Sequence, residues 1–177
     1  SDGTHPTADT STVVPVPGVN PGGDDSETAQ VLLPKGTPAR ASTEGGVAER
    51  WAGARVVIPK LGLDASVVDG VDLASLASGV GHWPGTALPG RPGNMVLAGH
   101  RTTHGAPFRR LDELVDGDEV IIASGATSVS YRVTGTEVVT PDRLDVARPT
   151  SSPTATLFAC HPPGSARQRI VVRLAVS

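Results

Sequence analysis

From about residue 47 onward, short apolar runs alternate with turns rich in Gly and Pro. Most of these runs are compact or alternate with polar residues, and they are rich in Val and Ile, as β-strands are. They lie at residues 55–58, 65–68, 94–98, 118–123, 128–139, 154–160 and 169–176. This spacing predicts seven or eight short strands in a sandwich or barrel, rather than alternating strands and helices.

Two further segments predict short helices. Asp72 is a suitable N-cap and Gly79 a suitable C-terminal stop for a helix between them. Residues 107–114 have room for one or two helical turns. Residues 124–127 contain Gly125 and predict the loop of a hairpin between two β-rich runs.

The last run predicts a strand with two different faces. Because side chains alternate along a strand, Ile170, Val172 and Leu174 share one face. Arg169 and Val171 share the other face. Arg169 therefore begins this strand pointing away from the more apolar side.

Residues 1–46 differ from the rest, being rich in Pro, Gly, Ser, Thr and Asp and lacking helical or strand periodicity. Such a composition buries too little apolar surface to offset the entropy of ordering, so it predicts an irregular linker. Residues 31–37, with the sequence VLLPKGT, are locally apolar. Two interpretations of this segment stay open: it docks on the folded domain, or it is plain linker.

Composition and charge narrow the function classes. The 177 residues suit one domain, residues 47–177, plus an extension. A net charge of −3 without a dominant basic patch gives no electrostatic reason to expect nucleic acid. No apolar run approaches the roughly 20 residues that span a bilayer.

Cys160 is the single cysteine of the chain. A lone thiol forms no internal disulfide and supplies no multi-cysteine metal site. It is either a small buried hydrophobe or a nucleophile. Arg167 and Arg169 follow it closely, and nearby cations favour the reactive thiolate.

A catalytic thiol needs an imidazole to exchange protons and a donor for the developing oxyanion. Among the five histidines, His100 is the strongest candidate because it follows the predicted strand 94–98, and strand ends hold side chains firmly. His82 and His104 fall in loops rich in Gly and Pro, and His161 adjoins the cysteine. A structural role for each histidine and arginine stays open, since spacing alone does not place them together.

Several longer motifs resemble one known family. The stretch LAGHRTTHGAPF at 97–108 resembles the histidine segment of sortases. TLFACHP at 156–162 and SARQRIVV at 165–172 resemble their cysteine and arginine segment. GHWPGT at 81–86 and IPKLGL at 58–63 add two more matches. The resemblance extends over residues 56–176 and is strongest to the actinobacterial class E sortases.

This resemblance implies a mainly β fold, a closed eight-stranded barrel of the sortase type with one or two short helices. It implies Cys160 as nucleophile, His100 as general acid/base and Arg169 as oxyanion and positioning residue. Arg169 is preferred to Arg167 because it immediately precedes the closing strand, as the family arginine does. Neither a metal nor another cofactor is implied.

The resemblance also implies a function. A cysteine transpeptidase of this family cleaves a C-terminal sorting signal of the Leu-Pro-x-Thr-Gly or, in class E, the Leu-Ala-x-Thr-Gly type between Thr and Gly. The acyl group then passes through a thioester to an amine of a cell-wall precursor or a pilin. The expected partners are secreted proteins bearing the signal. The expected location is the extracytoplasmic face of a Gram-positive membrane, through an N-terminal anchor missing from this sequence.

Two residues depart from the class E pattern. Trp83 replaces the usual Tyr, so an indole donor replaces a hydroxyl that both donates and accepts. Ala159 replaces the Thr that often precedes the cysteine. By the family layout, Trp83 and the residues Leu144 and Val146 are expected to contact the signal peptide.

Two alternative functions remain. One is a β-barrel binding module with an inert thiol. The other is a different cell-wall cysteine peptidase, but papain-like enzymes place the Cys before the His, and the His-Gly-Cys signature of L,D-transpeptidases is absent.

Overall fold

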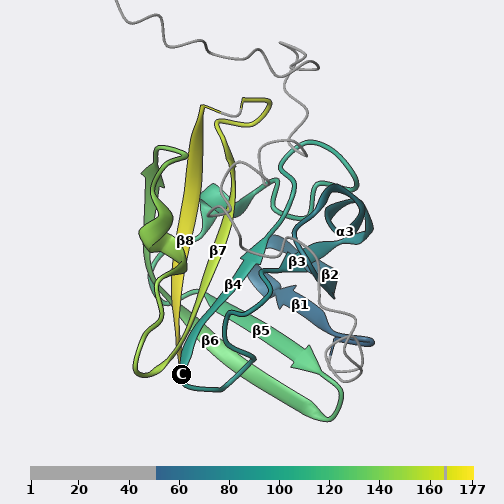
Figure 1. Cartoon of the computed structure of the whole chain (residues 1–177), viewed down its shortest axis with the longest axis vertical. Helices are drawn as coiled ribbons and strands as arrows, with labels where there is room; N and C mark the ends of the chain where they lie inside the picture. The colour runs from purple at the N-terminus through teal and green to yellow at the C-terminus, as the bar shows by residue number, and fades with distance from the viewer. Residues whose placement is uncertain (1–50, 166) are drawn as a thin grey trace, which may run out of the picture.

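The computed structural model describes residues 51–165 and 167–177, and the strands of this part of the chain close into a barrel (Figure 1). The order around the barrel is β1-β2-β3-β4-β7-β8-β6-β5. The strands are β1 (Arg55–Ile58), β2 (Leu63–Asp69), β3 (Val80–His82), β4 (Gly93–Ala98), β5 (Glu119–Ser124), β6 (Thr127–Val139), β7 (Pro153–His161) and β8 (Gln168–Val176). The predicted closed, eight-stranded β-barrel is confirmed.

Helices are few in the described residues. They are α3 (Leu73–Ser78) and the 3-10 turns η1 (Pro59–Leu61), η2 (Leu111–Glu113) and η3 (Leu144–Ala147). Asp72 caps α3 as predicted, because its carboxylate accepts from the backbone N–H of Ser75 at 2.8 Å. The helix expected over residues 107–114 is limited to η2.

Seven predicted runs correspond to strands, and β3 is the strand that the pattern missed. β3 has three residues with Gly81 in the middle. A Cβ at Gly81 would lie 2.2 Å from the carbonyl oxygen of Gly70, so only glycine fits beside β2. The predicted extension, residues 1–46, and its segment 31–37 lie outside the described residues. None of the helices in the described part has the length and apolar character needed to cross a bilayer.

β7 lies between a parallel and an antiparallel neighbour. It pairs in parallel with β4, so that Ala98 lies opposite Phe158. It pairs antiparallel with β8, so that Cys160 lies opposite Arg169. Figure 1 shows β7 and β8 as the long yellow hairpin with β4 beside β7.

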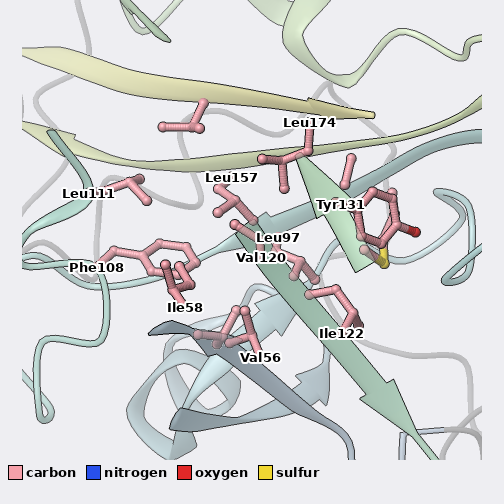
Figure 2. Close-up of a cluster of buried hydrophobic side chains, with 14 of the residues drawn as sticks. Val56, Ile58, Leu97, Phe108, Leu111, Val120, Ile122, Tyr131, Leu157 and Leu174 are labelled. Carbon is pink, nitrogen blue, oxygen red and sulfur yellow. The ribbon is translucent and has the colours of Figure 1, made fainter. Parts of the chain in front are cut away.

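The barrel interior is filled by aliphatic and aromatic side chains from all parts of the sheet. Leu157 and Leu174 from β7 and β8 point toward Val56 and Ile58 from β1, and Phe108 closes one end of the same cluster (Figure 2). At roughly 1.5–3 kcal/mol for each buried side chain of this size, the interior supplies much of the stabilising free energy.

A second apolar cluster lies on the opposite face of β4, β7 and β8. We call it the outer cluster, and its buried members are Val71, Leu76, Trp83, Val96, Ala98, Val139, Val146, Phe158 and Val171. Its strand residues alternate with those of the interior, as the pleat requires. The two-faced pattern predicted for the last strand is confirmed, because Ile170, Val172 and Leu174 are interior and Val171 is in the outer cluster.

Asn94 fastens the segment between β6 and β7 to this outer face. Its side-chain amide donates to the backbone carbonyls of Val146 at 3.0 Å and Arg148 at 3.2 Å. Its carbonyl accepts from the hydroxyl of Thr156 at 2.8 Å. Asn94 and Thr156 are both buried, so this network replaces the water that these groups would otherwise need.

Removing this fastening should destabilise the fold. Asn94→Ala leaves two backbone carbonyls and one hydroxyl without their partner, and each buried unsatisfied group costs about 1–3 kcal/mol before relaxation. We expect a loss of about 2 kcal/mol in the free energy of unfolding, measured by urea titration. The exposed Ser151→Ala in the same segment is the control, with an expected change within about 0.5 kcal/mol. Equal stability of the two variants would contradict the role given to Asn94.

The buried Tyr131 should make the free energy of unfolding fall at alkaline pH. Burial raises the pKa of Tyr131 above its ordinary value of about 10, although the hydrogen bond from the backbone N–H of Gly90 partly opposes this shift. The unfolded chain therefore ionises at a lower pH than the folded chain, and the free energy of unfolding falls as pH rises above about 10.

Tyr131 is the single tyrosine of the sequence, so tyrosinate absorbance reports it alone. We expect the folded protein to form tyrosinate at a higher pH than the urea-unfolded protein does. Tyr131→Phe should remove that part of the alkaline destabilisation. Identical titration curves for the folded and unfolded chains would contradict the assignment.

Candidate active site

His100 is held at the end of β4 by a close contact that requires glycine beside it. A Cβ at Gly99 would lie 2.6 Å from the ring of Phe108, so any larger residue there would displace the ring. The carbonyl of His100 accepts from the backbone N–H of Phe108 at 3.0 Å. Phe108 is fully buried in the interior, which anchors the His100 backbone to the barrel core.

Parallel pairing brings Cys160 next to this histidine. Ala98 and Phe158 are register partners, and the N–H of Gly99 donates to the carbonyl of Phe158 at 3.3 Å. His100 and Cys160 each lie two residues beyond that pair. Both side chains therefore emerge on the outer face, at matching ends of two neighbouring strands.

Arg169 reaches the same place from β8. It is the register partner of Cys160 across the antiparallel pair, and directly opposed residues point to the same face. Its Nη1 donates to the carbonyl of Gln168 at 2.7 Å. Arg167, the alternative arginine, is exposed in the turn before β8.

The three predicted catalytic side chains line one small pocket. Cys160 is 5% exposed, and His100 and Arg169 are each 1% exposed. The pocket has a volume of about 10 Å³, enough for one water molecule. Its lining residues are Leu76, Ala98, Gly99, His100, Phe158, Ala159, Cys160 and Arg169.

Arg101 is a site residue that the sequence analysis missed. It follows His100 directly and is 0% exposed. Its Nη2 donates to the carboxylate of Asp112 at 3.1 Å. Its Nη1 lies 3.4 Å from the carbonyl oxygen of Cys160 and 3.5 Å from Nδ1 of His161. A charged residue directly after the histidine was the signal available, but its burial depends on partners distant in sequence.

The other histidines occupy different positions. His104, at the rim, contacts His100 through its ring, with centroids 4.9 Å apart. The expectation that His82 lies in a loop is wrong, because it ends β3 and is buried. His82 had no apolar alternation around it that would have marked a strand.

His82 belongs to a buried polar network below the segment that carries Trp83. Its Nδ1 lies 2.7 Å from Asp69 and its Nε2 lies 3.1 Å from the carbonyl of Ala87. The ring stacks on Trp51 with centroids 4.5 Å apart. These contacts fix the end of β3 and therefore the backbone direction at Trp83.

The predicted peptide-contacting residues partly lie together. Trp83 and Val146 are both buried in the outer cluster, and the Trp83 ring lies 6.1 Å from that of Phe158, which also lines the cysteine pocket. Leu144 begins η3, and its side chain lies outside the described residues. Among residues 51–165 and 167–177, no group of three His, Cys, Asp or Glu side chains is placed to hold a metal ion.

Comparisons with known proteins agree with this geometry. A family model described as the sortase domain matches residues 56–176. Sortase D of Bacillus subtilis is 34% identical over 89 residues, covering 50% of this chain and 43% of the relative. Sortase SrtE1 of Streptomyces coelicolor is 30% identical over 131 residues, covering 65% of this chain and 37% of the relative. The chain thus spans less than half the length of these two curated relatives.

A solved structure gives the same result. The structure of sortase E from Streptomyces avermitilis superposes with a TM-score of 0.65 at 32% identity, covering 71% of this chain and 87% of the other. The family match covers nearly all of the barrel, and similarity to class E sortases appears in both sequence and structure. The chain belongs to the sortase family.

Proposed function

We propose that this chain is a cysteine transpeptidase that cleaves a sorting signal of the Leu-Ala-x-Thr-Gly or Leu-Pro-x-Thr-Gly type between Thr and Gly. Cys160 is the nucleophile, His100 the general acid/base, and Arg169 the oxyanion and positioning residue. One observation carries the proposal: these three side chains line one pocket at the ends of three neighbouring strands. Membership of the sortase family supports the same reaction class.

Acylation uses all three groups, and His100 acts in two of its steps. The proton of Cys160 passes to His100, and the thiolate attacks the carbonyl carbon of the signal's Thr. The developing oxyanion is stabilised by the guanidinium of Arg169, which stays charged at any working pH. The C–N bond then breaks, and His100 protonates the leaving amine of Gly.

In deacylation His100 acts as a base, after acting as an acid toward the leaving amine. An acceptor amine attacks the thioester carbon while His100 takes a proton from that amine. The C–S bond breaks, a new amide forms, and Cys160 is regenerated as the thiolate. The acceptor we propose is an amine of a cell-wall precursor or a pilin, and the donors are secreted proteins at the outer face of the membrane, where an N-terminal anchor would hold the enzyme.

The buried outer cluster supports the segments over which we place the apolar part of the signal. It extends from Phe158 beside the cysteine pocket to Trp83 and Val146. Asn94 holds the backbone that carries Val146 against β4. In the proposed complex the peptide lies over the segments that cover this cluster, with its Leu near Trp83 and η3, where Leu144 is a further proposed contact, and with its Thr carbonyl at Cys160.

The catalytic assignment predicts how cleavage of a fluorogenic signal peptide responds to mutation. Cys160→Ala and His100→Ala should each abolish cleavage, since the proposed mechanism takes the nucleophile from Cys160 and the proton from His100. Arg169→Gln should lower kcat by about 10²–10³, the usual effect of losing an oxyanion donor. Thermal unfolding of each variant checks that the fold is kept.

Arg173→Gln is the matched control for Arg169→Gln. Arg173 lies on the same face of β8, four residues further along, and binds Glu137 at 2.8 Å instead of lining the pocket. We expect cleavage near the wild-type rate. Wild-type turnover by a folded Cys160→Ala protein would instead favour the binding module with an inert thiol.

Trp83 predicts a change in signal preference. If a class E tyrosine hydroxyl contacts the signal, Trp83→Tyr should raise kcat/KM for the Leu-Ala signal relative to the Leu-Pro signal by about fivefold, the worth of one hydrogen bond. Trp83→Phe has the ring without the hydroxyl and should show no such rise. If the ratio of kcat/KM for the two signals is the same in Trp83→Tyr and Trp83→Phe, the hydroxyl does not determine signal preference.

A further inference from the structure

A second buried guanidinium lies behind the candidate nucleophile. Arg101 is 0% exposed, whereas the side chain of its partner Asp112 is 49% exposed. The guanidinium therefore stays in the protein while its countercharge is half in water. Solvent screens the charge of Asp112 more strongly than that of Arg101, so the pair leaves a net positive field inside the site.

The guanidinium of Arg101 lies at the end of β7. Its Nη1 is within reach of the Cys160 carbonyl and of Nδ1 of His161, at 3.4 and 3.5 Å. A guanidinium has donors only, so Nδ1 of His161 acts as an acceptor there. The contact links the residue after His100 to the backbone of Cys160, and it joins the two strand ends that the reaction needs side by side.

The charged and titratable groups around Cys160 come from every element packed against it. They are His100, Arg101 and His104 after β4, Asp112 in η2, Arg169 in β8 and His161 at the end of β7; His104 takes part through its ring contact with His100. Two of them are permanent cations, and Asp112 is the carboxylate bonded to one of these.

We propose that Arg101 is a positioning residue that stabilises the thiolate of Cys160 and holds its backbone, an inference that rests on the proposed function. Arg101 follows β4 and approaches Cys160 at its backbone carbonyl. Arg169 approaches from β8 and lines the pocket. The two arginines thus have different roles. Arg101 stabilises the thiolate before attack, and Arg169 stabilises the oxyanion of the substrate afterwards.

The test measures the thiolate without any substrate. Cys160 is the single cysteine, so the ultraviolet absorbance of the wild type minus that of Cys160→Ala reports its ionisation alone. Arg101→Gln should move the midpoint of thiolate formation to a pH about one unit higher, because the cation that contacts the backbone carbonyl of Cys160 has been lost. Arg101→Lys keeps the charge and should leave the midpoint near that of the wild type.

Asp112→Asn should shift the midpoint of thiolate formation in the opposite direction. It removes the carboxylate that offsets Arg101, so the midpoint should move to lower pH, while the exposure of this side chain lets the fold survive. Arg110→Gln is the control: it removes an exposed guanidinium from the same segment, one bonded to Glu113 at 2.7 Å, and should leave the midpoint unchanged.

A purely structural role for Arg101 predicts other results. In that case the midpoint stays constant in Asp112→Asn and in folded Arg101→Gln, or Arg101→Lys shifts it as far as Arg101→Gln does; either result overturns the proposal. If Arg101→Gln does not fold, the midpoints of thiolate formation in Asp112→Asn and Arg101→Lys test the proposal instead. Because the absorbance needs no peptide, failure here leaves the transpeptidase proposal standing, and cleavage by Cys160→Ala would defeat that proposal separately.

Discussion

The site depends on the register of β7 between its two neighbours. Parallel pairing with β4 aligns the ends that carry Cys160 and His100, and antiparallel pairing with β8 sets Arg169 directly across from the cysteine. A slip of one residue would turn Cys160 into the barrel interior and Ala159 outward. The interior side chains of β7, such as Leu157, would lose their packing in that slip. The packing that stabilises the barrel therefore also fixes the face on which the thiol lies.

The two faces of the sheet have different tasks. The interior cluster is almost entirely aliphatic and aromatic, with the Tyr131 hydroxyl satisfied by Gly90. The buried polar and charged residues on or near the outer face include Asn94, Thr156, His100, Arg101 and Arg169. Buried polar groups lower stability unless each finds a partner. Asn94 and Thr156 partner each other and the backbone and so stabilise the fold, whereas the buried guanidinium groups of Arg101 and Arg169 are a cost that the proposed function explains.

Most strands could be predicted because each depends on local alternation of apolar and polar residues. The two-faced pattern of the last strand even placed Arg169 on the correct side. β3 could not be predicted in this way, because three residues around Gly81 show no period and its pairing depends on a close approach to Gly70, the residue after β2. The burial of Arg101 was hidden for a related reason: Asp112 and the Cys160 carbonyl are brought to it by the fold. Motif resemblance supplied the three candidate catalytic residues that the local pattern left open.

The burial of Cys160 has to be weighed against the charges around it. A thiol that is 5% exposed fits an inert filler as well as a nucleophile, if burial alone is considered. An inert thiol, however, needs no cations nearby, and apolar residues would pack beside it without the desolvation penalty of two buried guanidinium groups. Arg101 and Arg169 are both buried within reach of the cysteine's backbone or pocket. Their free-energy cost is explained if the group they surround becomes an anion, which is the role that the proposed mechanism gives to the thiolate of Cys160.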